Sequence, residues 1–211
     1  MEIVVIGSDL NLNECREKFG TAHHYQLAGD DIKSYLAPGV FVFDFTVSDV
    51  SVYQNQNDVV VFLNTAFKTL TQLTTGQGLK ANVFGFCGLP TFLNREILEV
   101  CVPEGQLISL EKACLLLETK FRTVEDRMGM ITPRIICMII NEAYFTIEEG
   151  VASRDDIDQA MRLGTNYPFG PFEWCDKIGI RNVYELLKAV FEGTGDERYR
   201  ISKLLEKEAN A

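Results

Sequence analysis

The sequence predicts an α/β protein with two domains: a mainly parallel β-sheet domain over residues 1–125, followed by an all-α helical domain over residues 126–211. Two observations support this prediction. In the first domain, short apolar runs alternate with stretches of helical character, which is typical of parallel strands joined by helices. In the second domain, the apolar residues recur only at helical spacing.

The strands of the first domain are predicted from continuous apolar runs, because a strand buried on both faces needs no polar alternation. These runs occupy residues 2–7, His24–Leu27, Val40–Phe45, Asp58–Leu63, Asn82–Cys87 and Ile97–Val102, with a further short strand at Phe121–Val124. The stretches of helical character are Asn13–Phe19, Asp31–Leu36, Ala66–Thr74 and Ser109–Glu118. The connection between Phe45 and Asp58 fits either a loop or a short helix.

Two helices are expected at the start of the second domain. Over Pro133–Glu149 the apolar side chains recur at helical spacing, and Gly150 supplies a stop. The next helix is predicted to have Ser153 as its N-cap and Asp156 at its third position, and to stop at Gly164.

The stretch Gly164–Gly179, GTNYPFGPFEWCDKIG, contains three glycines, two prolines and the only tryptophan of the chain. Proline restricts the backbone and glycine permits bends that other residues resist. The stretch therefore predicts a rigid turn that leads into a short helix beginning at Pro171. Glu173 and Asp176 could be site acids, but acids near a helix start are stabilising, so we expect them to cap and position this helix.

Composition limits the classes of partner. Hydrophobic residues make up 46% of the chain and the formal net charge is −10, so we expect neither nucleic acid nor an anionic membrane as a partner. No stretch approaches a membrane span and no secretion signal is evident, which favours a cytoplasmic protein. The six cysteines are dispersed and only two histidines accompany them, so we expect buried thiols and no metal site.

A long motif runs from Asn141 to Gly179: Asn-Glu-Ala, Gly-x-Ala-Ser, an acidic-Ile-Asp cap, Met-x-Leu-Gly and Tyr-Pro-x-Gly-Pro-Phe-Glu. It resembles the helical C-terminal domain of the 3-hydroxyacyl-CoA dehydrogenases. The resemblance implies a Rossmann-like N-terminal domain, an NAD-dependent reaction and a homodimer formed through the helical domain. The helix Pro133–Glu149 suits such an interface, because it is apolar around more than half its circumference. A generic helical bundle that shares caps and glycines by chance is the alternative.

The expected dinucleotide-binding turn is incomplete. Gly-x-Gly-x-x-Gly should follow the first strand, but the chain has Gly7-Ser-Asp-Leu-Asn-Leu12. Asp9 would place a carboxylate where a diphosphate rests, and Leu12 would place a branched side chain where helix and strand must approach. Asp30 lies about the right distance downstream to hold a ribose, although an acidic start to the helix Asp31–Leu36 is the interpretation we favour. We therefore expect no cofactor, and NAD only if the family activity persists.

The catalytic positions are inferred from the same resemblance. In the family, a histidine takes the proton of the 3-hydroxyl, a glutamate orients it, and a serine and an asparagine contact the substrate. The segment Asn64–Val100 resembles the family segment that opens Asn-Thr-Ser and closes Leu-Val-Glu-Val. On this spacing, Ala66 replaces the serine, Cys87 replaces the histidine and Glu99 is retained. Pro133 replaces the asparagine.

No obvious residue takes over as general base. His23 and His24 lie at the start of the second predicted strand, remote from the expected site. Cys87 could act as a replacement base, but a small buried residue is the interpretation we favour, because free cysteine is commonly buried. Glu99 could instead cap a helix or face water.

Two hypotheses about function follow. The first is a catalytically impaired 3-hydroxyacyl-CoA dehydrogenase-like protein that keeps a dimeric binding or scaffolding role, with an acyl-CoA-like small molecule as a possible ligand. The alternative is an active NAD-dependent oxidoreductase on a 3-hydroxyacyl-CoA or a related hydroxy compound. We favour the first, because three of the four catalytic positions are substituted. The family's long helical arm over the acyl-CoA is also missing, since twelve residues separate Leu27 from Val40.

Overall fold

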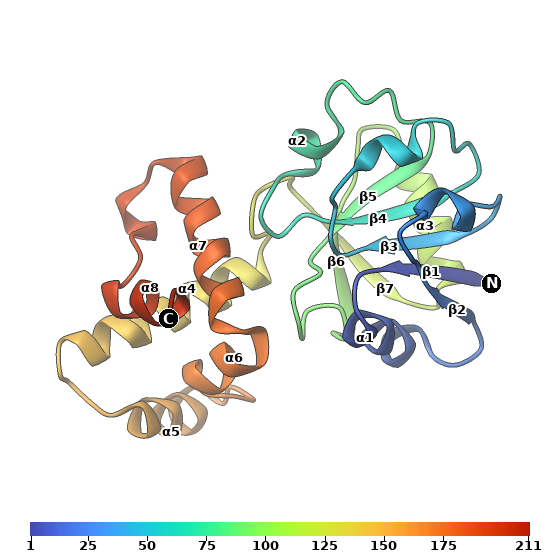
Figure 1. Cartoon of the computed structure of the whole chain (residues 1–211). Helices are drawn as coiled ribbons and strands as arrows, with labels where there is room; N and C mark the ends of the chain where they lie inside the picture. The colour runs from blue at the N-terminus through green and yellow to red at the C-terminus, as the bar shows by residue number, and fades with distance from the viewer. The chain divides into compact units, whose positions relative to one another are not determined.

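The computed structural model describes residues 1–211 and divides into two compact units, Met1–Met130 and Ile131–Ala211 (Figure 1). The sequence predicts this division after residue 125. Residues 126–130 lie with the first unit because hydrogen bonds tie them to it. The Asp126 carboxylate accepts two backbone N–H groups at the start of a helix in that unit, and the Gly129 N–H donates to the Ala66 carbonyl at 3.0 Å.

The first unit is built on a seven-stranded sheet in the order β2-β1-β3-β4-β5-β6-β7. Its strands are β1 (Glu2–Ile6), β2 (His24–Leu27), β3 (Phe41–Asp44), β4 (Val60–Asn64), β5 (Asn82–Phe86), β6 (Ile97–Cys101) and β7 (Lys120–Val124). Neighbouring strands are parallel except β5 and β6, which run antiparallel. The predicted mainly parallel sheet is confirmed.

The helices of this unit lie near the predicted stretches but differ from them in their bounds. They are α1 (Asp9–Phe19), α2 (Leu70–Thr74) and α3 (Leu107–Leu116), with the 3-10 helices η1 (Ile32–Tyr35) and η2 (Val50–Tyr53). The stretch Asp31–Leu36 forms only the short η1. Asp31 stands at its N-cap, as the expected acidic start requires, but the side chain makes no capping hydrogen bond. Helix α2 begins at Leu70 and not at Ala66, because the Thr69 hydroxyl caps it.

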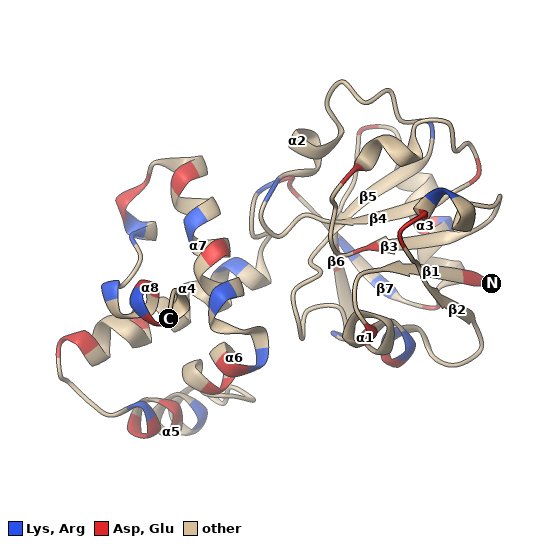
Figure 2. Ribbon diagram, in the orientation of Figure 1, with Lys and Arg blue, Asp and Glu red and all other residues tan.

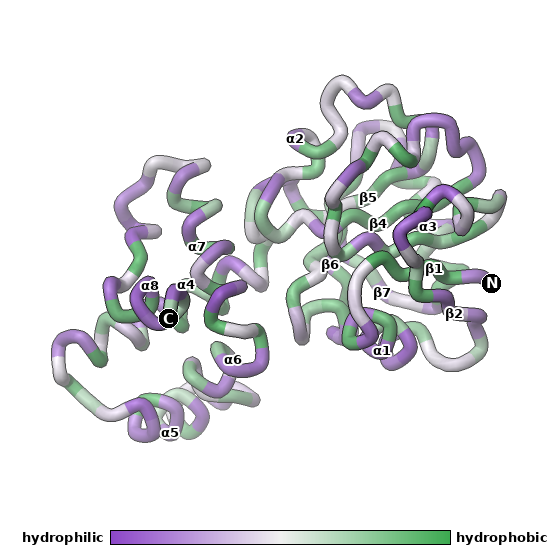
Figure 3. Tube along the Cα trace, in the orientation of Figure 1, coloured by the Kyte–Doolittle hydropathy of each residue, from purple (hydrophilic) through white to green (hydrophobic).

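A cluster of phenylalanine rings fills one face of the sheet. The ring centroid of Phe43 on β3 lies 4.7 Å from that of Phe62 on β4 and 4.9 Å from that of Phe19 on α1. Phe86 on β5 meets Phe43 edge-on at 5.5 Å. Figure 3 shows the central strands of the sheet mainly in the green of hydrophobic residues. Burying one such side chain stabilises a fold by about 1.5–3 kcal/mol, which explains why the strands are continuous apolar runs in the sequence.

The parallel strands β1 to β4 end at one edge of the sheet. From β1 the chain passes to β2 on one side, and β3 lies on the other side, so the strand order reverses at β1. In open α/β sheets, ligands bind at such a reversal, outside the carboxyl ends of the strands. Gly7 and Asp30 follow β1 and β2 at this edge, and Ala66 follows β4.

The second unit is all α-helical, as predicted. Its helices are α4 (Thr132–Glu148), α5 (Arg154–Thr165), α6 (Pro171–Ile178), α7 (Ile180–Thr194) and α8 (Lys203–Ala209), with the 3-10 helix η3 (Glu197–Tyr199). Helix α4 is central, because it contacts each of the other four α-helices. No helix of the protein combines the length and the apolarity needed to cross a bilayer.

The starts of α5 and α6 agree with the predictions, whereas the end of α5 does not. The Ser153 hydroxyl accepts the Asp156 N–H at 3.2 Å, and α6 begins at Pro171, so both predicted starts are confirmed. The predicted stop at Gly164 is wrong. Helix α5 passes through Gly164 and ends at Thr165, because Asn166 takes the left-handed conformation with φ of 56°.

Candidate functional site

Asn64, the last residue of β4, joins the carboxyl ends of three strands. Its Nδ2 donates to the Phe45 carbonyl after β3 at 3.1 Å. Its Oδ1 accepts the N–H of Ala66 at 3.1 Å and the N–H of Gly88, after β5, at 2.9 Å. The two substituted family positions Ala66 and Cys87 therefore lie at one polar junction. Asn64 is not among the site residues predicted from the sequence; the available signal was an amide residue directly after the apolar run Asp58–Leu63.

Cys87 and Glu99 are brought together by the antiparallel pairing of β5 with β6. Gly85 pairs with Cys101, and continuing this register by two residues places Cys87 opposite Glu99. Cys87 is only 5% exposed. Burial, with smaller contributions from the Glu99 and Glu14 carboxylates, raises the pKa of its thiol to about 12. A buried thiol that is protonated at neutral pH agrees with the interpretation of Cys87 as a small buried residue.

The turn between β1 and α1 is closed by its own side chains. Ser8 caps α1, and its backbone N–H donates to Asn11 Oδ1 at 2.9 Å. The same oxygen accepts the Ser8 hydroxyl at 2.9 Å. A Cβ atom at Gly7 would lie 2.5 Å from this oxygen, so the carboxamide lies directly over the glycine. Asp9 is the first residue of α1, and Leu12 is 8% exposed in the core.

The remaining N-terminal candidates lie at opposite edges of the sheet. Asp30 is exposed and follows β2 at the same edge as Gly7. His24 pairs with Glu2 at the amino end of β1, so the two adjacent histidines lie at the opposite edge of the sheet. Neither histidine is therefore placed to assist the junction at Asn64.

Pro133 lies in the second unit, buried in the first turn of α4. Proline is favoured there because its missing N–H would have no partner within the helix. It offers no hydrogen-bonding side chain in place of the family's asparagine. The substitution is therefore explained by the start of the helix.

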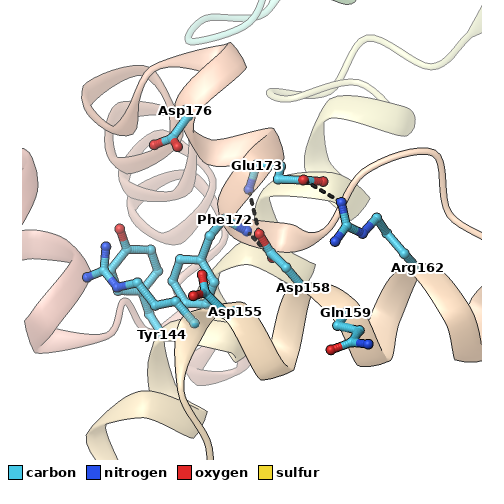
Figure 4. Close-up of a pocket in the computed structure, with 9 residues that line it drawn as sticks. Tyr144, Asp155, Asp158, Gln159, Arg162, Phe172, Glu173 and Asp176 are labelled. Carbon is cyan, nitrogen blue, oxygen red and sulfur yellow. Dashed lines mark hydrogen bonds and ion pairs between the residues drawn. The ribbon is translucent and has the colours of Figure 1, made fainter.

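A pocket of about 410 Å³ lies among α4, α5 and α6 in the second unit (Figure 4). Asp158 of α5 is 8% exposed and accepts the N–H groups of Phe172 at 2.8 Å and Glu173 at 3.1 Å, so it caps α6. The Glu173 carboxylate accepts the Gly170 N–H at 2.9 Å, which confirms its predicted capping role. Asp176 is exposed and forms no hydrogen bond, so its expected capping role is wrong.

The arginines of this pocket are engaged by neighbouring side chains. Arg154 lies over the rings of Tyr144, at 5.3 Å, and Phe172, at 5.0 Å, and is paired with Glu208 at 2.5 Å. Arg162 is paired with Glu173 at 2.5 Å. The pocket wall is thus a structural network that fixes α5 and α6 on α4.

The charged residues, possible metal ligands and cysteines were also located in the structure. Figure 2 shows acidic and basic residues interspersed along the helices of the second unit. No group of three or more His, Cys, Asp and Glu side chains is arranged to hold a metal ion. All six cysteines are free and buried.

The fold and the candidate site together define a Rossmann-like protein with an appended helical unit and an altered dinucleotide turn. Residues 129–211 match the family described as 3-hydroxyacyl-CoA dehydrogenase, C-terminal domain. The chain is related to the 3-hydroxyacyl-CoA dehydrogenases, and residues 129–211 form their C-terminal domain.

Individual relatives agree with this assignment. The 3-hydroxyadipyl-CoA dehydrogenase of Escherichia coli (strain K12) is 44% identical over 101 residues, which cover 46% of this chain and 21% of that protein. A probable 3-hydroxybutyryl-CoA dehydrogenase of Deinococcus radiodurans is 32% identical over 154 residues, which cover 70% of this chain and 55% of that protein. The chain spans about half or less of the length of the curated relatives it matches.

A solved structure shares the fold. The crystal structure of (S)-3-hydroxybutyryl-CoA dehydrogenase PaaH1 from Ralstonia eutropha matches with a TM-score of 0.73 and 18% identity. The match covers 98% of this chain and 92% of that chain. The predicted fold class is therefore confirmed by an independent structure.

Proposed function

We propose that this chain is a 3-hydroxyacyl-CoA dehydrogenase-like protein that has lost hydride transfer and keeps a binding or scaffolding role as a homodimer. The observation that carries the proposal is Cys87, which stands where the resembled family has its histidine. With a pKa raised to about 12, the thiol is ionised to only about one part in 10⁵ at neutral pH. A histidine, by contrast, is largely in its neutral, basic form there. Proton abstraction from a 3-hydroxyl therefore lacks its base.

The geometry of the turn after β1 supports the proposal that the chain does not bind a dinucleotide. A diphosphate requires free N–H groups at the helix N-terminus and close approach to the glycine. Asn11 lies over Gly7 and holds the Ser8 N–H, while Asp9 adds a negative charge to the first turn of α1. Each 1.4 kcal/mol of lost interaction weakens binding about tenfold, so these changes together are enough to remove micromolar affinity for NAD.

Exposed apolar side chains on α4 support the proposal that the chain forms a homodimer. Ile135 is 53% exposed, and Met138 and Ile139 on the next turn are partly exposed. Apolar side chains grouped on one helix of a soluble unit commonly mark a protein interface. In the resembled family the helical domain forms the homodimer.

The proposal is tested by titrating the purified protein with NADH while nicotinamide fluorescence is followed. We expect no saturable change at sub-millimolar NADH, and no reduction of NAD in the presence of 3-hydroxybutyryl-CoA. A Glu99→Gln variant provides the matched control. If the unchanged protein reduces NAD and Glu99→Gln does not, the retained glutamate is catalytic and the proposal fails.

A second variant tests whether the closed turn after β1 by itself prevents NADH from binding. Asn11→Gly removes the carboxamide from Gly7 and frees the Ser8 N–H, so NADH affinity is expected to rise, while Asn13→Gly on the same helix leaves it unchanged. Circular dichroism of both variants establishes that α1 still forms. Equal behaviour of the two variants would show that Asn11 does not control access to the turn.

A further inference from the structure

A small hollow of about 160 Å³ lies outside the carboxyl ends of β3 and β4, entirely within the sheet unit. The apolar residues of its lining are Phe45, Val47, Phe67 and Leu73, and the polar ones are Thr46, Asn64 and Lys68. It lies beside the point at which the strand order reverses, where open α/β sheets bind ligands. Its position therefore makes it a candidate ligand site.

The volume restricts the ligand to a small molecule. A cavity of about 150 Å³ accommodates one benzene molecule, whereas pockets for larger ligands usually measure about 300–1,000 Å³. A dinucleotide or a coenzyme A molecule is much larger than this hollow. A ligand with a compact body and a single polar end fits its size.

Two donors of the hollow are available to an anion. Lys68 is exposed, forms no hydrogen bond or ion pair within the protein, and is the one charged side chain of the lining. Asn64 uses one N–H of its carboxamide for the Phe45 carbonyl and retains the other. A carboxylate has two oxygens that accept such bonds, and charge-assisted bonds to an ammonium group are strong.

The rim of the hollow is held in a strained conformation. Val47 has φ of 48°, which is unusual for a β-branched residue. Its N–H donates to Asp44 Oδ1 at 2.8 Å, and the Tyr53 hydroxyl donates to Asp44 Oδ2 at 3.0 Å. Asp44 is 1% exposed, and its carboxylate is engaged by protein donors. The strained rim is therefore fixed in place, and Lys68 remains free for a ligand.

We propose that this hollow binds a small monocarboxylate of about the size of benzoate or butyrate. The carboxylate lies between the Lys68 ammonium and the free N–H of Asn64, and the apolar body packs against Phe45 and Phe67. This assignment goes beyond the proposed function, because it names a ligand class that needs neither NAD nor a catalytic base.

The test is a calorimetric titration of the full chain with sodium benzoate and sodium butyrate in the absence of NAD. At least one of the two is expected to bind saturably at millimolar concentration. Neutral benzamide is expected to bind at least about tenfold more weakly than benzoate, because it lacks the charge-assisted bonds. NADH titration is a separate measurement, so failure here leaves the result for NAD unaffected.

Variants assign the binding to the hollow. Lys68→Met keeps the length of the side chain without its charge and is expected to weaken carboxylate binding at least about tenfold. Lys80→Met, at another exposed lysine of the same unit, is expected to leave it unchanged, and Leu73→Trp is expected to abolish it by filling the space. Urea unfolding confirms that each variant is folded. Absence of saturable binding to the wild type, or equal binding to wild type and Lys68→Met, would overturn the proposal.

Discussion

Gly170 and Asp158 are packed so closely that a Cβ atom at the glycine would lie 2.3 Å from the aspartate carboxyl group. That carboxylate holds the N–H groups of Phe172 and Glu173 at the start of α6. The glycine supplies the space and the aspartate supplies the cap. Two residues of the family motif, the aspartate of its acidic-Ile-Asp cap and the glycine before Pro171, therefore act as one structural unit.

Substitution of the glycine tests this arrangement. Gly170→Ala is expected to lower the free energy of unfolding by about 1–3 kcal/mol, the usual cost of overpacking a buried site, as measured by urea unfolding. Gly164→Ala is the matched control, because no atom would lie within 4 Å of its Cβ inside α5. It is expected to stabilise the protein by about 0.5–1 kcal/mol through higher helix propensity. A neutral result for Gly170→Ala would show that Asp158 can move without loss of its capping bonds.

At the scale of elements, α8 is anchored to α4 by polar side chains. The Glu148 carboxylate accepts the Ser202 hydroxyl and the Leu204 N–H, each at 2.6 Å. Asn141 donates to the Arg200 carbonyl and accepts the Ser202 N–H, both at 2.9 Å. Asn141 is 2% exposed and Ser202 is fully buried. The position of α8 on α4 thus depends on hydrogen bonds that a buried site cannot exchange for water.

A second contact anchors the end of α8. Glu208 accepts the Tyr144 hydroxyl at 3.1 Å and is paired with Arg154 at 2.5 Å. Hydrogen bonding to Arg154 holds the pKa of Glu208 below its usual value. Hydrogen bonding to Ser202 and Leu204 likewise lowers the pKa of Glu148.

These two shifts predict a pH dependence. Because both pKa values are lower in the folded state, the unfolded chain binds more protons in acid, and stability present above the ordinary glutamate pKa is lost as the pH falls. We expect the free energy of unfolding to decrease between about pH 5 and pH 3. Glu148→Gln should flatten this dependence when urea unfolding is followed across the range. Glu149→Gln, at the adjacent exposed residue, should leave it unchanged, and the same slope in both variants would contradict the role of Glu148.

At the scale of the whole molecule, the two units differ in how far their central elements are covered from solvent. The sheet unit covers its strands on both faces, and the central strand residues Val5, Val42 and Phe62 are fully buried. The helical unit leaves Ile135 on α4 more than half exposed. We propose that a second copy of the chain covers this exposed apolar side chain on the central helix.

Light scattering after size-exclusion chromatography tests this assembly. The protein is expected to have the mass of a dimer at micromolar concentration, and Ile135→Lys is expected to give a monomer, because a buried unpaired charge disfavours the interface. Leu163→Lys on α5 is the control, since this leucine is 78% exposed outside the α4 surface. A monomeric wild type would exclude the homodimer.

The sequence by itself determined the features that depend on neighbouring residues. Short runs rich in apolar residues located all seven strands. The runs are most continuous in β1, β3, β4 and β5, because these strands are buried along most of their length. Local capping chemistry located the starts of α5 and α6. The stop at Gly164 was predicted wrongly, because glycine occurs both within helices and at their ends and the sequence does not distinguish the two cases. The structure does, because Asn166 and not Gly164 takes the left-handed conformation that ends α5.

Only the tertiary structure decided the roles that depend on distant partners. Asn64 bonds Gly88, which is 24 residues away, and Asp158 caps a helix that begins 13 residues later. The closure of the Gly7 turn by Asn11 is short in sequence, but it depends on the direction of a side chain that has several rotamers. Hydrogen bonds are directional and short in range, so the sequence could name the substituted site positions, whereas folding decided which groups meet there.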